Sequence, residues 1–224
     1  VSLYKKLSYD PVKDFTPIGK IGETGFILMV QADFPAKDMK EFIAYGKANP
    51  GKLIYGSWSV GNPVHLGSEL LESVTGTQME HVIYKETTQL YTSVATGELS
   101  FALGSAGTAG PMYRAGKLRL LAFTAPKRSP DFPDIPTVGE SGGPKDFEVT
   151  GWNVVAVPPG LSAATTDKIR KDLVEVLKDK DFAEKFKTFG YEPFPTTPEQ
   201  FQATVKAESQ RFGDVIRKAN ITLD

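Results

Sequence analysis

The sequence predicts an α/β fold with a parallel-rich open sheet and helices on both of its faces. Between residues 37 and 124, short apolar runs alternate with segments whose apolar residues recur at helical spacing. This alternation is typical of parallel strands joined by crossover helices, and such sheets are covered on both sides. After residue 157 the pattern is almost wholly helical, which indicates that this segment belongs to a different part of the molecule.

The first helix of the alternation is expected between residues 38 and 49. Asp38 and Glu41 have the spacing of a capping box, and the motif Asn49-Pro50-Gly51 ends the helix. The run at 52–57, KLIYGS, follows as a strand. Together these signals predict one complete helix–strand unit.

The second helix has clear boundary signals at both ends. Asn62 is a good N-cap, and Pro63 lies at the first helical position, where its missing N–H costs nothing. Gly76 is expected to end the helix, as glycine commonly does. The apolar residues expected on its buried face are Leu66, Leu70, Leu71 and Val74.

The same alternation continues to residue 124. Further strands are expected at 79–84, 99–103 and 118–124. A helix that is capped by Thr87 or Thr88 and ends at Gly97 separates the first two strands. A poorer helix at 105–115 precedes the third, because it contains two glycines and a proline.

The chain changes character after a proline-rich loop at 126–136. A long strand is expected at 147–157, and one long helix then carries an apolar stripe from residue 169 to 189. The motif Thr197-Pro198-Glu199 starts a final helix. The compact α/β unit therefore spans about residues 26–146.

Composition excludes several classes of protein. The 224 residues include 26 basic and 27 acidic side chains, so no global positive field favours nucleic acid. There are no cysteines and only two histidines, which leaves no thiolate chemistry and no multi-histidine metal site. No apolar run reaches the roughly 18 residues of a membrane span. We expect neither a metal nor a cofactor.

Small polar residues gather where the predicted strands end. In an open parallel sheet, ligands bind beyond the carboxyl ends of the strands, at the amino ends of the following helices. Those positions are 57–62, 85–88, 104–108 and 125–128, and the first three are rich in Ser, Thr, Gly and Asn. Exposed amides and small hydroxyls suit an anion such as a carboxylate. The candidate ligand-binding residues are Ser57, Trp58, Ser59, Gly61, Asn62, His65, Lys85, Thr87, Thr88, Gly104, Ser105 and Ala106.

Each of these loops also has a purely structural interpretation, since small polar residues before helices are often only caps and turns. Lys85 either pairs with an acidic ligand or is simply solvated. Trp58 either lines the site or packs against a neighbouring loop. Three such loops at one sheet edge favour the functional interpretation.

A catalytic interpretation has weaker support. The run Ser57-Trp58-Ser59-Val60-Gly61 misses the hydrolase motif Gly-x-Ser-x-Gly by one residue. A Ser59 nucleophile would call for a histidine far down the chain, and the later one, His81, falls within a predicted strand. Neither glycine-rich phosphate motif occurs. The sequence predicts a protein that is not an enzyme, with a serine hydrolase using Ser59 and a truncated assembly module as the alternatives.

Longer motifs are more specific than composition. The segments YDPVKDFTPIGKI, ANPGKLIYGS, GNPVHLGSELLESVTG, HVIYK, AGKLRLLAFTAPKRSPDFPDIPTVGESG and GYEPFPTTPEQF occur in this order. Together they resemble the extracytoplasmic solute receptors of tripartite tricarboxylate transporters, the Bug or TctC-type family. The resemblance covers essentially the whole chain, and its most distinctive part is the run Lys-Arg-Ser-Pro-x-x-Pro-Asp-x-Pro-Thr-Val.

The resemblance implies a hinged, two-domain periplasmic binding protein with a type II-like fold. Such a receptor closes around a small organic mono- or dicarboxylate or an aromatic acid and delivers it to a membrane permease. Residues 26–146 would be the second, ligand-binding domain, 1–25 a remnant of the first domain and crossover, and 147–224 the return strand and C-terminal helices of the first domain. An N-terminal portion of the first domain is then expected to be missing, and a dimer could form through the surface it would cover.

Three departures from the family pattern fall near the predicted site. The resemblance assigns the ligand loops to 57–66, 85–88 and 104–107. Ile83 stands where the family has proline, Glu86 where it has glycine, and Trp58 where a small residue is usual. The extra carboxylate disfavours a dianionic ligand unless Glu86 turns away. Trp58 would make the pocket tighter or suit it to an aromatic or short acid.

Overall fold

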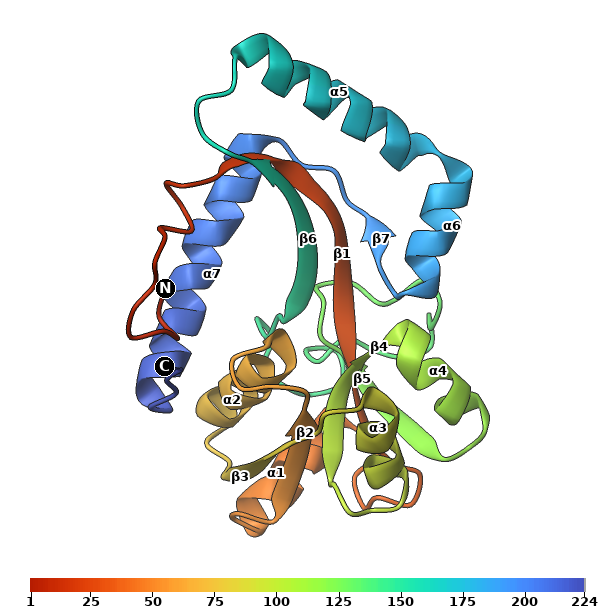
Figure 1. Cartoon of the computed structure of the whole chain (residues 1–224). Helices are drawn as coiled ribbons and strands as arrows, with labels where there is room; N and C mark the ends of the chain where they lie inside the picture. The colour runs from red at the N-terminus through yellow and green to blue at the C-terminus, as the bar shows by residue number, and fades with distance from the viewer. Residues whose placement is uncertain (224) are drawn as a thin grey trace. The chain divides into compact units, whose positions relative to one another are not determined.

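The computed structural model describes residues 1–223, which fold into two compact units. Unit 1 is formed by Val1–Thr24 together with the chain from Gly151 onward, and unit 2 is formed by Gly25–Thr150. The chain therefore runs from unit 1 into unit 2 and back again (Figure 1). Both units contain strands and helices, so the α/β prediction is confirmed.

The sheet of unit 2 has the strand order β3-β2-β4-β1-β5. Its strands are β1 (Thr16–Gln31), which begins in unit 1, β2 (Leu53–Ser57), β3 (Met79–Ile83), β4 (Phe101–Ser105) and β5 (Leu118–Phe123). β2 pairs in parallel with both β3 and β4, whereas β1 runs antiparallel between β4 and β5. All strands except β1 thus point the same way, which confirms the parallel-rich open sheet.

The pattern of the sequence does not predict β1, which occupies an interior position in the sheet. Ile27, Met29 and Val30 are fully buried in it. A strand that is buried on both faces reads as a continuous apolar run, and periodicity alone cannot tell it from a buried helical segment. This antiparallel strand separates β4 from β5, and the alternation of strands and helices in the sequence does not predict its insertion there.

The first two helices of unit 2 have the boundaries that their capping residues predict. Helix α1 (Met39–Ala48) is capped by Asp38, whose side chain accepts from the Glu41 amide. Helix α2 (Pro63–Thr75) starts with proline after the N-cap Asn62. It ends at Gly76, whose φ of 68° lies in the left-handed region that favours glycine.

Two local expectations about the helices of unit 2 are wrong. The remaining helices are α3 (Thr87–Ala95) and α4 (Ala106–Arg114). Thr87 and Thr88 do not cap α3, because the extended N-cap residue is Glu86 and both threonines lie inside the helix. Val74 of α2 is 51% exposed. The apolar stripe of α2 is thus wider than the face that the sheet covers.

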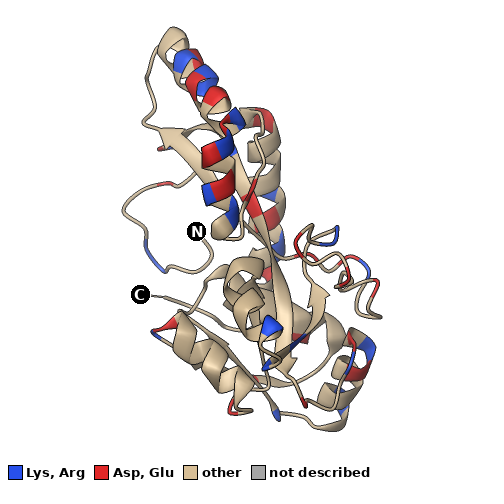
Figure 2. Ribbon diagram, turned by 90° about the vertical axis from the view of Figure 1, so that its right-hand side faces the viewer, with Lys and Arg blue, Asp and Glu red and all other residues tan. Residues whose placement is uncertain are grey.

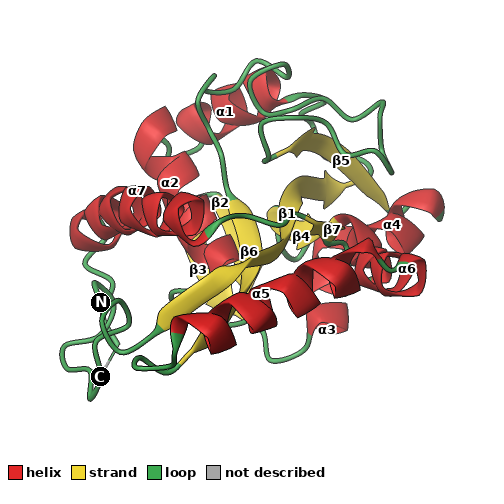
Figure 3. Ribbon diagram, turned by 90° about the horizontal axis from the view of Figure 1, so that it is seen from above, coloured by secondary structure: helices red, strands yellow, loops and turns green. Residues whose placement is uncertain are grey.

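Helices cover both faces of this sheet (Figure 3). The crossover from β2 through α2 to β3 and the crossover from β3 through α3 to β4 run in opposite directions. Because such crossovers are right-handed, α2 and α3 lie on opposite faces. On the α2 face, the Phe101 ring packs against the rings of Phe42 and Tyr55, with centroid distances of 5.2 and 5.4 Å. The core of the α3 face includes Ile27, Met29, Leu90, Tyr91, Val94, Leu99 and Ala102.

Unit 1 is built on the first part of β1 and on the C-terminal segment. Its other elements are β6 (Thr150–Val157), α5 (Ala163–Lys178), α6 (Lys180–Thr188), β7 (Glu192–Pro193) and α7 (Pro198–Lys218). Both β6 and β7 pair with β1. The single helix expected over 169–189 is wrong: Asp179 leaves the helical conformation and caps α6 by accepting from the Phe182 amide. The strand expected from residue 147 begins at Thr150.

The helices of unit 1 carry charges of both signs (Figure 2). The ion pairs along α5 are Lys168–Asp172, Arg170–Asp167 and Lys178–Glu175, at 2.6, 2.9 and 2.7 Å. Pairs at this helical spacing stabilise the helix by a few tenths of a kcal/mol each. In the part of the chain that the structure describes, no helix is long and apolar enough to cross a lipid bilayer.

Replacing Thr197 by alanine is expected to lower the free energy of unfolding by about 1 kcal/mol, the usual loss for an N-cap. The Thr197 hydroxyl accepts from the Gln200 amide at 3.2 Å, and the Gln200 side chain accepts from the Thr197 amide at 2.9 Å. This capping box begins α7. Urea unfolding of the parent and of Thr197→Ala would measure the loss, and Thr197→Ser is the control. An equal loss in Thr197→Ser would show that the hydroxyl cap is not its source.

Candidate functional site

The carboxyl ends of β2, β3 and β4 lie at one edge of the sheet in unit 2, because these strands run parallel to one another. The helices α2, α3 and α4 begin at that edge (Figure 1). It therefore carries the three predicted loops, at 57–62, 85–88 and 104–108, and we call it the loop edge. The role of these residues in ligand binding stays a prediction.

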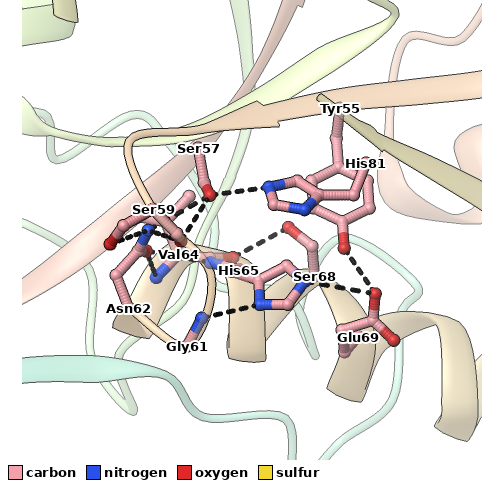
Figure 4. A network of polar contacts seen from close by, with 10 residues as sticks. All are labelled: Tyr55, Ser57, Ser59, Gly61, Asn62, Val64, His65, Ser68, Glu69 and His81. Carbon is pink, nitrogen blue, oxygen red and sulfur yellow. Dashed lines mark hydrogen bonds and ion pairs between the residues drawn. The ribbon is translucent and has the colours of Figure 1, made fainter. Parts of the chain in front are cut away.

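Ser57, the last residue of β2, is fully buried among partners from its own chain (Figure 4). Its hydroxyl donates to the Ser59 carbonyl oxygen at 3.0 Å and accepts from Asn62 Nδ2 at 3.1 Å. His81 Nε2 lies 2.7 Å away. A hydroxyl donates one hydrogen and accepts two, so His81 donates to Ser57 from Nε2. The Ser57 hydroxyl is thereby saturated and shapes the loop from within.

Asn62 connects this loop to helix α2. Its Oδ1 accepts from the amides of Val64 and His65, at 2.8 and 3.0 Å. Its Nδ2 donates to Ser57 Oγ and to the Ser59 carbonyl oxygen. One side chain therefore satisfies two free amides at the helix start and also fixes the turn that precedes it.

Two histidines stack on each other on the α2 face. The ring centroids of His65 and His81 are 4.1 Å apart, and the Tyr55 ring stacks on His81 at 5.0 Å. The Gly61 amide donates to His65 Nδ1 at 3.0 Å, so that nitrogen carries no hydrogen. Burial, and then the neighbouring His65, lower the pKa of His81 to about 4. Burial also lowers the pKa of His65, partly offset by Glu69. Both rings are neutral at pH 7.

A carboxylate completes this cluster. Tyr55 donates its hydroxyl hydrogen to Glu69 Oε1 at 2.6 Å, and the same oxygen lies 3.6 Å from His65 Nε2. Burial, together with Glu69, raises the pKa of Tyr55. Burial and then Glu69 raise the pKa of Glu72 as well. The cluster therefore connects β2 to α2 through the Tyr55–Glu69 hydrogen bond, and it connects both elements to β3 through the stacked His81 ring.

Trp58 and Ser59 are the solvent-facing part of the first loop. Trp58 is 38% exposed, so its ring is neither packed away nor fully free. Ser59 is exposed. Gly61 has a φ of 80°, which is the left-handed conformation that a residue with a side chain rarely adopts. The loop thus presents one aromatic ring and one hydroxyl to solvent on a backbone that glycine makes possible.

The helices α3 and α4 begin without a side-chain cap. Neither the Glu86 nor the Ser105 side chain accepts a hydrogen bond from a backbone amide of the helix turn that follows it. Lys85, Thr87 and Thr88 are exposed beside the start of α3. Free amides at the positive end of a helix favour an anion. The second and third loops therefore offer backbone donors as well as hydroxyls.

The third loop rests on a chain of hydroxyl groups. Tyr91 is buried, and its hydroxyl lies 3.0 Å from Thr108 Oγ1, which lies 3.0 Å from Ser105 Oγ. Gly104 is closely packed, because a Cβ there would collide with the Tyr91 hydroxyl. Ala106 is half-buried at the first position of α4. Gly104 thus lets β4 pack closely against the Tyr91 side chain.

The Ser59 hydrolase alternative gains no support from this geometry. The serine beside a histidine is Ser57, and it is fully buried. Ser59 Oγ is instead 3.5 Å from Asn62 Nδ2. Within residues 1–223, no group of three or more His, Asp or Glu side chains could hold a metal ion.

Sequence reasoning missed several residues of this network. His65 and Glu69 are four residues apart on a helix, and that spacing alone could have paired them. Tyr55 and His81 are cross-strand partners in the register of β2 and β3. Sequence alone does not give this register, and neither does it place Tyr91 against Thr108.

Comparison with known proteins places the chain among the solute receptors of membrane transporters. A family model described as the tripartite tricarboxylate transporter family receptor, TctC, matches residues 2–221. The chain belongs to this family, and the resemblance seen in the sequence is confirmed. The members of the family are receptors.

Individual relatives agree with this assignment. A Cupriavidus necator protein, described as a UPF0065 protein in the gbd 5' region, is 34% identical over 91% of this chain and 62% of its own length. The solved structure of R. palustris Rpa4515 with adipate has 29% identity and a TM-score of 0.82, covering 98% of this chain and 73% of that one. MatC (Rpa3494) of Rhodopseudomonas palustris, with bound malate, has 26% identity and a TM-score of 0.79, covering 96% and 74%. The chain thus spans less than two thirds of the Cupriavidus protein.

Proposed function

We propose that this protein captures a small organic dicarboxylate outside the cytoplasm, in the periplasm, for transfer to the membrane permease of a tripartite transporter. Unit 2 would be the ligand-binding domain, and the loop edge would supply its donors. The segments at 1–25 and 147–224 would belong to the other domain of the receptor. The observation that carries the proposal is the convergence of three helix starts at one sheet edge, two of them without a side-chain cap.

The chemistry of this edge suits carboxylate. The amides in the first turns of α3 and α4 carry partial positive charge and need acceptors. The exposed hydroxyls of Thr87 and Thr88 lie beside the amides of α3. Neutral donors of this kind grip a carboxylate oxygen without an arginine, and they release it more readily than a buried ion pair would.

Two features of the edge bear on which acid is bound. Glu86 is exposed at the start of α3, where water screens its charge and where Lys85 precedes it. Trp58 leaves part of its ring accessible in the first loop. The accessible ring favours an acid with an apolar or aromatic body as a second candidate class, beside the aliphatic dicarboxylates.

The proposal predicts that the protein binds at least one member of a panel of adipate, malate and benzoate. Calorimetric titration would measure the affinity. A ligand present at about 100 times its Kd should stabilise the protein by about 2.7 kcal/mol, which a melting curve detects. Adipamide, which lacks the charges, is the control and should not bind.

A matched pair of variants on α3 localises the site. Thr88→Val should weaken binding by about tenfold, the loss expected for one hydrogen bond to a charged group. Thr92→Val, one turn further along the same exposed face, should leave the affinity unchanged. If a broad panel of carboxylates gives no binding, the proposed function is wrong. Labelling of Ser59 by an active-site serine probe would support the hydrolase instead.

A further inference from the structure

We propose that His65 is a positioning residue that holds the loop at 58–62 in its binding form only while its ring is neutral, so that acid releases the loop. The consequence for ligand binding rests on the proposed function, whereas the behaviour of the loop does not. The device has one partner at each ring nitrogen, the Gly61 amide at Nδ1 and the Glu69 carboxylate at Nε2.

The first partner requires an unprotonated nitrogen. The Gly61 amide points its hydrogen at His65 Nδ1 from 3.0 Å, and a protonated imidazole has no acceptor to offer. Protonation of Nδ1 would place its N–H group opposite the N–H group of Gly61, and two donors cannot form a hydrogen bond with each other. Gly61 holds a left-handed φ of 80° in the turn that directs its amide to the ring.

The second partner favours the charged ring. His65 Nε2 lies 3.6 Å from Glu69 Oε1, a distance that a small movement of the ring would shorten to a hydrogen bond. Neutral His65 therefore accepts the hydrogen bond from Gly61. Protonated His65 would move towards Glu69 and lose that hydrogen bond. A histidine whose contact with one partner requires the neutral ring, and whose contact with the other strengthens when the ring is charged, is a two-state element whose balance follows pH.

The groups around the ring determine where this change occurs. They are His81 on β3, Tyr55 on β2 and Glu69 on α2 itself. Glu72, also on α2, interacts with Glu69. The burial of the ring lowers the pKa of His65, and Glu69 partly offsets this effect. Because the pKa of His81 is lowered to about 4, His81 stays neutral while His65 titrates. The transition is expected below the ordinary histidine range near pH 6.5.

Trp58 reports the loop directly, because it lies within the released segment. The sequence has two tryptophans, and the other, Trp152, is removed by Trp152→Phe. In that background, without ligand, Trp58 fluorescence should change reversibly between pH 7.5 and 4.5, with a midpoint below 6.5 and an unchanged far-ultraviolet circular dichroism spectrum.

Two variants decide whether His65 is responsible. His65→Gln offers Gly61 an acceptor that does not titrate, so the fluorescence change should disappear. Glu69→Gln keeps the acceptor for Tyr55 but removes the charge, so the midpoint should fall. A parent without a transition, or His65→Gln that keeps the parental transition, overturns the proposal. If His65→Gln does not fold at pH 7, an unchanged midpoint in Glu69→Gln overturns it.

Measuring ligand affinity as a function of pH separates this proposal from the proposed function. Below the midpoint, the affinity for adipate or malate should fall by about tenfold per pH unit in the parent, because binding then needs the release of one proton. In His65→Gln it should follow only the titration of the acid itself. Binding that is absent at every pH contradicts the proposed function, while the ligand-free fluorescence still tests the loop. Parental binding that does not depend on pH below the fluorescence midpoint overturns the link between loop and ligand.

Discussion

Replacing Asn62 by alanine is expected to lower the free energy of unfolding by about 2–4 kcal/mol and to abolish ligand binding at the loop edge. Alanine removes the N-cap of α2, a loss of about 1–2 kcal/mol. It also removes one of the two donors to the Ser57 hydroxyl and one of the two donors to the Ser59 carbonyl oxygen, because His81 and the Ser57 hydroxyl remain as the other donors. The two lost hydrogen bonds together cost about 1–3 kcal/mol. Urea unfolding and calorimetric titration with the acid panel would measure the two losses.

Asn62→Asp is the matched control for this change. Aspartate keeps an oxygen for the amides of Val64 and His65, so most of the cap on α2 should survive. It has no hydrogen for the Ser59 carbonyl oxygen, and its charge repels a bound carboxylate. The variant should therefore lose more affinity than stability. Unimpaired binding in Asn62→Asp would show that the turn at 58–62 is not part of the ligand site.

Phe101→Ala is expected to lower the free energy of unfolding by about 3–5 kcal/mol, the range for truncating a buried phenylalanine. Phe101 is fully buried at the start of β4, and its ring contacts the rings of Phe42 and Tyr55. The cavity would open between α1 and the sheet. The same unfolding experiment measures the loss.

Val74→Ala is the control for Phe101→Ala in the same unit. Val74 is 51% exposed on α2, and alanine has the higher helix propensity, so the change should stay within about 0.5 kcal/mol. A loss in Val74→Ala as large as in Phe101→Ala would mean that something packs on this helix face. A loss below about 1 kcal/mol in Phe101→Ala would contradict its place in the core.

Local chemistry made much of unit 2 predictable from the sequence. Asn62-Pro63 and Gly76 mark the ends of α2, because a cap, a proline ring and a left-handed residue act within a few bonds of one another. The capping box at Thr197 marks α7 for the same reason. The gathering of small polar residues after the strands also pointed to the loop edge, since parallel strands end together.

Contacts between distant residues were not predictable in this way. The strand β1 lies between β4 and β5 because its apolar run is satisfied on both faces, and a run of that kind does not state its partners. Ser57 meets His81 only through the register of two strands. The single helix expected over 169–189 breaks because Asp179 caps its second half, although the apolar stripe runs through the break.

The sequence by itself determined the alternation of elements, the ends of the best-capped helices and the family, because caps, turns and motifs are properties of neighbouring residues. Only the tertiary structure decided which partners the loop side chains contact and which of them are exposed. In the folded protein, the Ser57 and Asn62 side chains form hydrogen bonds within the loop itself. His65 stacks on His81, and Trp58 is partly exposed at the surface. Those outcomes depend on strand register and side-chain packing, which bring together residues that are distant in the chain.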